Sequence, residues 1–91
     1  MTIGIYFRPA SMSADQYDAI IKRLESAGSG TPASRLYHVC FGAGDSLQVF
    51  DVWESQQAFD DFGATLMPIL QEVGVDPGQP MIEPVHSVIP G

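Results

Sequence analysis

The segment between residues 36 and 53 constrains the fold most, because two runs of β-branched and aromatic residues flank one cluster of turn residues. The runs are Leu36 to Phe41 and Leu47 to Trp53, and Gly-Ala-Gly-Asp-Ser lies between them. Such runs favour extended strands, and glycine with aspartate favours a tight turn. The segment therefore predicts a β-hairpin with two antiparallel strands.

A strand and a helix are predicted before the hairpin. Residues Thr2 to Arg8 alternate apolar and other side chains, which is typical of a strand, and Pro9 interrupts the alternation. Ser13 and Gln16 form a capping-box pattern, after which apolar residues recur at helical spacing as far as Gly28. We therefore expect an amphipathic helix between the first strand and the hairpin.

A second helix and a last strand are predicted after the hairpin. Ser55 can cap a helix that Gly74 closes, and Pro68 should kink that helix or restart it one turn later. Met81 to Ile89 reads as a strand, and Pro84 cannot donate a ladder hydrogen bond, so this strand is expected at a sheet edge or to be irregular there. The order strand, helix, strand, strand, helix, strand matches the split βαβ plan.

The length of 91 residues suits one domain. We predict a single α+β domain over residues 1–91, with ferredoxin-like βαββαβ topology and a four-stranded antiparallel sheet. A domain this small is usually stabilised by disulfides, a metal or association with another chain. The single cysteine, Cys40, excludes an internal disulfide and suggests the reducing cytoplasm as the location.

Charge and hydropathy narrow the range of partners. The formal net charge is -7, which disfavours phosphate backbones and anionic lipid. No apolar run approaches the roughly 20 residues that a membrane span requires. Neither nucleic acid nor a membrane is therefore expected as a partner.

The hairpin register predicts which side chains share a face of the sheet. Counting outward from a turn centred on Gly44 and Asp45 places one set of residues together. This mixed set pairs Cys40 with Val49, His38 with Asp51 and Leu36 with Trp53. The opposite face is more uniformly apolar, so we expect it to meet the helices; it carries Tyr37, Val39, Phe41, Phe50 and Val52.

The mixed set would then face outward together with Tyr6. Two helices cover only one face of a sheet, and an exposed apolar patch usually marks association or ligand binding. A second copy of the chain is the simplest cover, and we expect a homodimer that encloses a cavity for a small organic molecule.

Within that cavity, His38 and Asp51 are the candidate catalytic residues. A carboxylate beside an imidazole fixes its tautomer and raises its basicity, as a general base requires. The alternative is a satisfied polar pair that stabilises the sheet. Trp53 and Tyr6 could stack on a planar ligand, or simply pack at the dimer interface.

Other polar residues offer weaker candidates. Cys40 could be a nucleophile if its thiolate were stabilised, but a free cysteine is more often a small buried hydrophobe. A metal site is conceivable, but its ligands would lack the close sequence spacing typical of metal motifs. The ligands would be His38, Cys40, Asp51 and His86. Arg8 and Arg35 are candidate anion contacts or solvated surface charges. The residues predicted to bind substrate are Trp53, Tyr6, Cys40, Leu36, Val49 and His86.

The segment from Val49 to Phe59 (VFDVWESQQAF) resembles the strand-to-helix signature of the dimeric α/β-barrel superfamily, in particular the antibiotic biosynthesis monooxygenase-like domains. His38 and the stretch from Met67 through His86 are similar to a subgroup of small uncharacterised proteins of that kind. The resemblance implies a dimeric α/β barrel and a pocket lined by the motif tryptophan, here Trp53. Known activities in the superfamily include cofactor-independent oxygenation of aromatic polyketides, haem degradation and small-molecule isomerisation.

Two hypotheses about function follow. The first is a monooxygenase-like enzyme without a bound cofactor, in which His38 takes a proton from a planar organic substrate. The alternative is a non-catalytic dimeric binding or stress-response module. An open pocket of a few hundred cubic ångströms would favour the enzyme, and a filled interior would favour the alternative.

Overall fold

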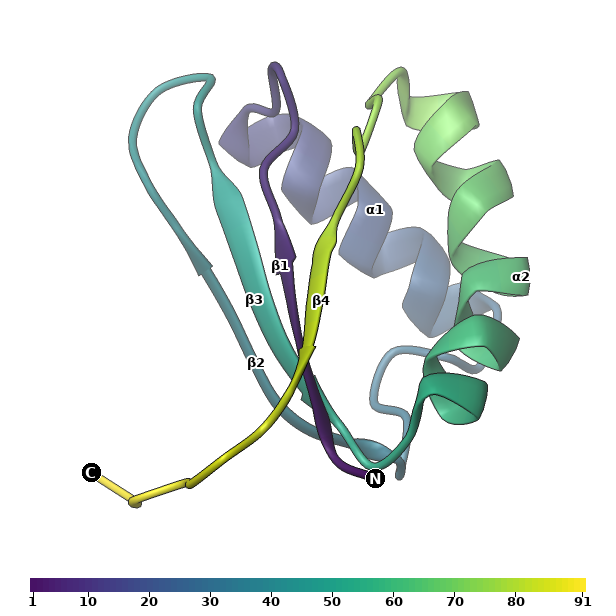
Figure 1. The fold of residues 1–91 in the computed structure, drawn as a ribbon. Helices are drawn as coiled ribbons and strands as arrows, with labels where there is room; N and C mark the ends of the chain where they lie inside the picture. Colours follow the sequence, from purple (N-terminus) through teal and green to yellow (C-terminus); the bar gives the residue numbers. More distant parts are fainter.

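The computed structural model describes residues 1–91, and its secondary structure follows the predicted order (Figure 1). The elements are β1 (Ile3–Phe7), α1 (Ala14–Ser26), β2 (Arg35–Phe41), β3 (Gln48–Trp53), α2 (Gln56–Val73) and β4 (Met81–Pro84). None of the helices has the length and apolar character that a membrane crossing requires. The ferredoxin-like βαββαβ topology is confirmed.

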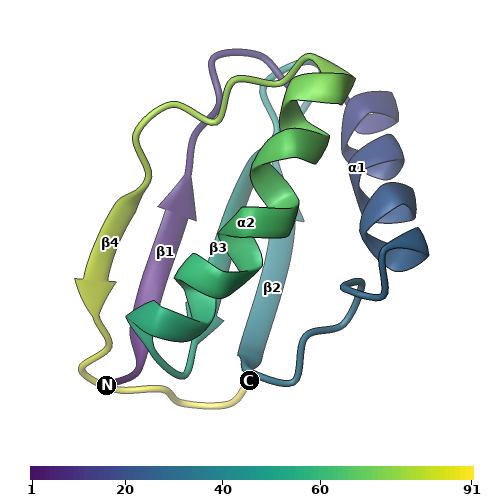
Figure 2. The same ribbon diagram turned by 90° about the vertical axis from the view of Figure 1, so that its right-hand side faces the viewer.

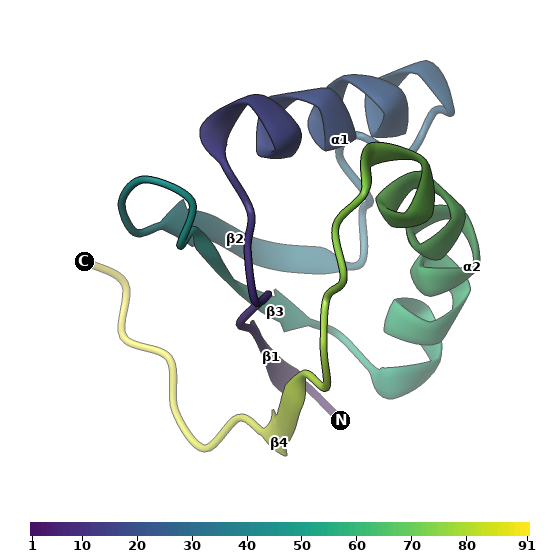
Figure 3. The same cartoon turned by 90° about the horizontal axis from the view of Figure 1, so that it is seen from above.

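The four strands form one antiparallel sheet in the order β2-β3-β1-β4, and both helices cover the same face of it (Figure 2). The strand β4 lies at an edge, as predicted, but it ends at Pro84 rather than Ile89. Proline lacks the N–H that would continue the ladder. The chain beyond it leads away from the sheet on the side opposite the helices (Figure 3).

Local sequence signals set the helix ends. The Ser13 side chain accepts a hydrogen bond from the Gln16 backbone N–H, and the Gln16 side chain accepts one from the Ser13 N–H, so the predicted capping box is present. Ser55 caps α2, and Gly74 ends it with φ of 85°. The helix continues through Pro68 as one element and does not restart.

The core lies between the sheet and the helices. Ile5 and Trp53 are its most buried large side chains, at 0% and 1% exposure. The indole of Trp53 packs against the rings of Phe59 and Phe62, with centroid distances of 5.7 Å and 4.9 Å. Burying a large apolar side chain contributes about 1.5 to 3 kcal/mol, so this cluster holds α2 on the sheet.

The predicted facing of the hairpin is wrong. His38 opposes Asp51 and Cys40 opposes Val49, as predicted, but this row faces the helices and not the outside. The reason lies in the central strand β1, whose apolar row pairs with the β3 residues of the mixed set. The pairs are Ile3 with Trp53, Ile5 with Asp51 and Phe7 with Val49.

The outermost predicted pair is also wrong. The register shifts between Arg35 and Tyr37, so that Arg35 opposes Trp53 and the side chain of Leu36 is 54% exposed. The open face of the sheet is instead the uniformly apolar one, which the prediction assigned to the helices. Tyr37 and Phe41 are 55% and 44% exposed there.

The loop between β1 and α1 is fastened to the hairpin loop. The backbone N–H of Met12 donates to the carbonyl of Asp45 over 2.7 Å, and the N–H of Leu47 donates to the carbonyl of Met12 over 3.2 Å. The side chain of Met12 is buried in the core at 3% exposure. This connection fixes the start of α1 relative to the hairpin.

Candidate functional site

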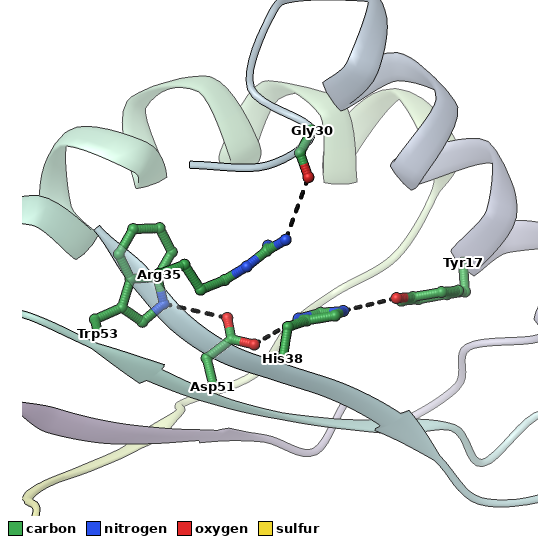
Figure 4. Close-up of polar contacts among 6 residues, drawn as sticks. All are labelled: Tyr17, Gly30, Arg35, His38, Asp51 and Trp53. Carbon is green, nitrogen blue, oxygen red and sulfur yellow. Dashed lines mark hydrogen bonds and ion pairs between the residues drawn. The ribbon is translucent and has the colours of Figure 1, made fainter. Parts of the chain in front are cut away.

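His38 and Asp51 form the centre of the site, on the neighbouring strands β2 and β3. Their side chains point toward one another beneath the helices, and Nδ1 of His38 lies 2.5 Å from Oδ1 of Asp51 (Figure 4). Asp51 is 3% exposed and is the charged residue buried in the core. Trp53 donates its Nε1–H to the other carboxylate oxygen over 3.2 Å. Both oxygens of the buried carboxylate therefore accept a hydrogen bond.

Tyr17 extends this arrangement from the helix layer. Its hydroxyl oxygen lies 2.6 Å from Nε2 of His38, and the two rings are stacked with planes 11° apart. The result is a continuous chain of hydrogen bonds in the order Trp53, Asp51, His38 and Tyr17 (Figure 4).

The chemistry of the four side chains determines which atom carries the proton in each of these hydrogen bonds. An indole nitrogen only donates and a carboxylate only accepts, so Nδ1 of His38 carries the proton shared with Asp51. In the neutral imidazole, Nε2 then holds the lone pair and accepts the Tyr17 hydroxyl proton. The carboxylate therefore fixes the tautomer in which Nε2 is the basic atom.

The surroundings of Tyr17 keep its hydroxyl protonated. Burial raises the pKa of Tyr17 above its ordinary 10.0, the neighbouring acidic groups of Cys40, Asp51 and Asp18 add to that effect, and the Arg35 guanidinium opposes it. In neutral solution Tyr17 is thus a phenol and a hydrogen-bond donor.

A small cavity adjoins this row of hydrogen bonds, between the sheet and the helices of the same polypeptide. Its volume is about 60 Å³, room for about two water molecules. Ten of the fourteen lining residues are hydrophobic. The polar part of its wall consists of Tyr17, Arg35, His38 and Asp51. Shallower surface depressions are larger, but none of those contains the His38 and Asp51 pair.

Arg35 adds a positive charge to the cavity wall. One of its guanidinium nitrogens donates to the carbonyl of Gly30 over 3.2 Å (Figure 4). The guanidinium carbon also lies 5.9 Å from the ring centre of Phe62. Neither ion pair of the structure involves Arg35. Its other N–H groups can therefore bind an anionic group on a ligand.

The structure brings together only some of the residues predicted to bind substrate. Val49 lines the cavity beside His38 and Asp51. Trp53 lies behind the carboxylate and supports it by hydrogen bonding. Cys40 shares their face of the sheet and packs against the core, but it is not part of the cavity wall.

The remaining three lie elsewhere. Tyr6 is on the open face of the sheet, where its hydroxyl donates to Gln48, so it cannot stack with Trp53. Leu36 is exposed at the register shift. His86 follows β4 and borders a shallow depression on the open face with Tyr6.

Cys40 is a poor nucleophile in this setting. Burial raises the pKa of its thiol, and the negative charge of Asp18 raises it further. The reactive form of cysteine is the thiolate, which such an environment disfavours. The structure contains no group of three or more His, Cys, Asp or Glu side chains that could hold a metal ion.

Tyr17 is a residue of the site that was not predicted from the sequence. This residue stands at the first position of the apolar stripe of α1, where a tyrosine reads as core packing. The available signal was its hydroxyl, the one polar atom in a stripe that otherwise consists of Ile20, Ile21 and Leu24. Buried tyrosine hydroxyls usually have a partner, and His38 is the partner here.

Comparison with known proteins adds information at the level of the fold. No protein-family model and no curated protein sequence matches the chain significantly. Among solved structures, a variant of SnoaB, a cofactor-independent oxygenase from Streptomyces nogalater, superposes with a TM-score of 0.69 at 13% identity, covering 99% of this chain and 98% of that one.

Two further structures are similar along their whole length, and each is provisionally named an antibiotic biosynthesis monooxygenase. The one from Chloroflexus aurantiacus has a TM-score of 0.65 at 16% identity and 100% coverage of both chains. The one from Deinococcus radiodurans has a TM-score of 0.63 at 12% identity and covers 99% of this chain and 97% of that one. The chain therefore has the ferredoxin-like fold of the antibiotic biosynthesis monooxygenase-like proteins.

Proposed function

We propose that this protein is a small-molecule enzyme of the monooxygenase-like kind, which acts on a planar organic substrate without a bound cofactor. The observation that carries the proposal is the contact of 2.5 Å between His38 and Asp51 in the wall of a mostly apolar cavity. Fold neighbours that include the cofactor-independent oxygenase SnoaB support it.

The arrangement suits proton abstraction. When the imidazole takes a proton at Nε2, the positive charge forms 2.5 Å from a carboxylate that is already oriented by Trp53. The substrate keeps the electron pair of the broken C–H bond as a carbanion, and Arg35 supplies a positive charge in the same wall. Dioxygen is the oxidant that would then react with this carbanion.

The size of the cavity sets a condition on binding. A volume of about 60 Å³ is too small for an aromatic ring, because a cavity that holds benzene measures about 150 Å³ and ligand pockets usually measure a few hundred cubic ångströms. Ile20, Ile21 and Leu24 of α1 form part of the wall, so substrate entry requires this helix or its side chains to move outward. We therefore expect binding to be accompanied by a displacement of α1 relative to the sheet.

The test is oxygen uptake with a panel of planar aromatic ketones and hydroxyarenes, supplied to the purified protein. We expect turnover with at least one compound, and a loss of about 100-fold or more in His38→Ala, since general bases contribute 10²- to 10⁴-fold. His86→Ala is the matched control, because His86 is exposed on the opposite face of the sheet. Full turnover by His38→Ala would overturn the proposed base.

A non-catalytic binding or structural module is the second candidate, and two observations favour it. The cavity is small, and every buried side-chain nitrogen and oxygen already has a partner within the chain. In that case compounds from the panel would raise the melting temperature without any oxygen uptake, or would have no effect at all.

We also propose that the protein is a homodimer joined through the open face of the sheet. Tyr37, Phe41 and Met81 expose 55%, 44% and 61% of their surfaces there, and an apolar sheet face of this kind usually has a cover. Phe41→Glu should shift the mass measured by light scattering from dimer to monomer. Met67→Glu, which changes an exposed apolar residue on α2, should leave the mass unchanged.

A further inference from the structure

We propose that Tyr17 is the residue that takes the proton from the substrate, and that it passes its own proton to His38 in the same step. This inference deepens the proposed function and rests on it. It concerns which atom of the site meets the substrate.

The Tyr17 hydroxyl blocks the basic nitrogen of His38 from the substrate. His38 has one basic lone pair, on Nε2, because its other ring nitrogen holds the proton shared with Asp51. That lone pair lies 2.6 Å from the Tyr17 oxygen and accepts its hydrogen. A substrate can reach Nε2 directly only if the tyrosine moves away.

The Tyr17 oxygen, by contrast, is free to accept a proton from the substrate. A phenol oxygen can accept a hydrogen bond while its own hydrogen is donated. Tyr17 belongs to the cavity wall, and its hydroxyl makes no hydrogen bond other than the one to His38. A substrate in the cavity therefore meets an unoccupied oxygen lone pair that is backed by a base.

The step is balanced for atoms and charge. The substrate C–H bond breaks, its electron pair stays on the substrate, and its proton goes to the Tyr17 oxygen. The original O–H bond of Tyr17 breaks at the same time, and that proton goes to Nε2 of His38. The products are a substrate carbanion, a neutral Tyr17 and an imidazolium paired with the Asp51 carboxylate.

The electrostatics of Tyr17 agree with a coupled transfer. Burial raises the pKa of Tyr17, so the residue does not ionise alone in neutral solution. Among the charged groups that act on it, only Arg35 favours negative charge on its oxygen. Arg35 thus lies where it can stabilise the charge that develops on that oxygen during the transfer.

The test separates the relay from direct attack by His38, because Tyr17→Phe removes the oxygen and uncovers Nε2. The assay is the exchange of α-protons of 2-indanone, a planar carbon acid, for deuterium in buffered D₂O, followed by proton NMR. It measures proton abstraction without any oxidation. The relay predicts that Tyr17→Phe lowers the exchange rate about 100-fold, whereas direct attack predicts an unchanged or higher rate.

Controls keep the outcomes distinguishable. Tyr37→Phe changes an exposed tyrosine on the open face and should exchange like the wild type. The melting temperature and the NMR signal of the Nδ1 proton of His38 report whether Tyr17→Phe keeps the fold and the Asp51 contact. If His38→Ala abolishes exchange and a folded Tyr17→Phe does not, the relay is overturned and the proposed base stands. If the wild type accelerates neither this exchange nor oxygen uptake with any compound of the panel, the proposed function is overturned and the relay with it.

Discussion

The hydrogen bond from Trp53 to Asp51 gives a quantitative prediction for stability. Trp53→Phe keeps an aromatic ring in the core but removes the N–H that donates to the buried carboxylate over 3.2 Å. The carboxylate, at 3% exposure, then keeps only His38 as a partner. We expect a clear loss of stability, because a buried charge is left partly unsatisfied.

The magnitude follows from two contributions. A hydrogen bond to a charged group is worth about 1.5 to 3 kcal/mol. The smaller ring also leaves a gap beside Phe59 and Phe62, which costs about 1 to 2 kcal/mol more. Trp53→Phe should therefore lower the free energy of unfolding by about 2.5 to 5 kcal/mol, a large share of the about 5 to 15 kcal/mol typical of a domain.

Urea unfolding measures this loss. Trp53 is the single tryptophan of the chain, so the transition is followed by far-UV circular dichroism, at one protein concentration for all variants. Asp51→Ala and the double variant complete a cycle that isolates the contact, and the coupling energy should be about 1.5 to 3 kcal/mol. A coupling energy near zero would refute the assignment of Trp53 as a support for the carboxylate.

Four further predictions concern the hairpin, the second helix, the thiol and the tyrosine. Gly42→Ala should destabilise by more than about 1 kcal/mol, because Gly42 has φ of +123° and an added Cβ would lie 2.6 Å from the Ser46 carbonyl oxygen. Gly63→Ala, in a helix with open space around it, should stabilise the fold by about 0.5 to 1 kcal/mol. The urea midpoints of the two variants should therefore move in opposite directions, and a shift of both in the same direction would contradict these two predictions. Because burial raises the pKa of the Cys40 thiol, a disulfide reagent at pH 8 should label the native protein at least about tenfold more slowly than the urea-unfolded chain, and equal rates would contradict the burial. Since the pKa of Tyr17 is raised above 10.0 in the folded state, unfolded chains release that proton first, and the free energy of unfolding should fall as the pH rises beyond 10; Tyr17→Phe should remove this part of the slope in alkaline urea titrations.

The order of the elements could be predicted because the signals are local. Ser13 and Gln16 specify a helix start through hydrogen bonds within one turn, and Pro84 limits the last strand through its missing N–H. The pairing of His38 with Asp51 is similarly local, since the hairpin turn sets the register over a few residues.

The facing of the sheet could not be obtained in the same way. The alternation of side chains along a strand shows which residues share a face of the sheet. Both faces of β3 carry apolar residues, however, so composition does not show which face meets the helices. The decisive contact is between Ile5 and Asp51, which come from distant parts of the chain. A buried carboxylate is acceptable in the core only because Trp53 and His38 satisfy it, and those contacts exist only in the folded chain.

The position of Tyr17 depends on tertiary structure for the same reason. Helical spacing assigns it to the buried stripe of α1, but only the packing of α1 against β2 brings its hydroxyl to His38. The position of Tyr6 also depends on how the strands pair. Because Ile3 pairs with Trp53 and Tyr6 pairs with Phe50, the side chains of Tyr6 and Trp53 lie on opposite faces of the sheet.

The connection through Met12 links the exposed hairpin loop to the proposed proton transfer. Its hydrogen bonds to Asp45 and Leu47 fasten the loop that leads into α1 to the hairpin that carries His38. The spacing between the phenol and the imidazole is therefore adjustable from residues on the surface that touch no ligand. In a directed-evolution experiment, a library confined to the exposed residues 43–46 should retune the proposed proton transfer while every group in the cavity wall stays as it is.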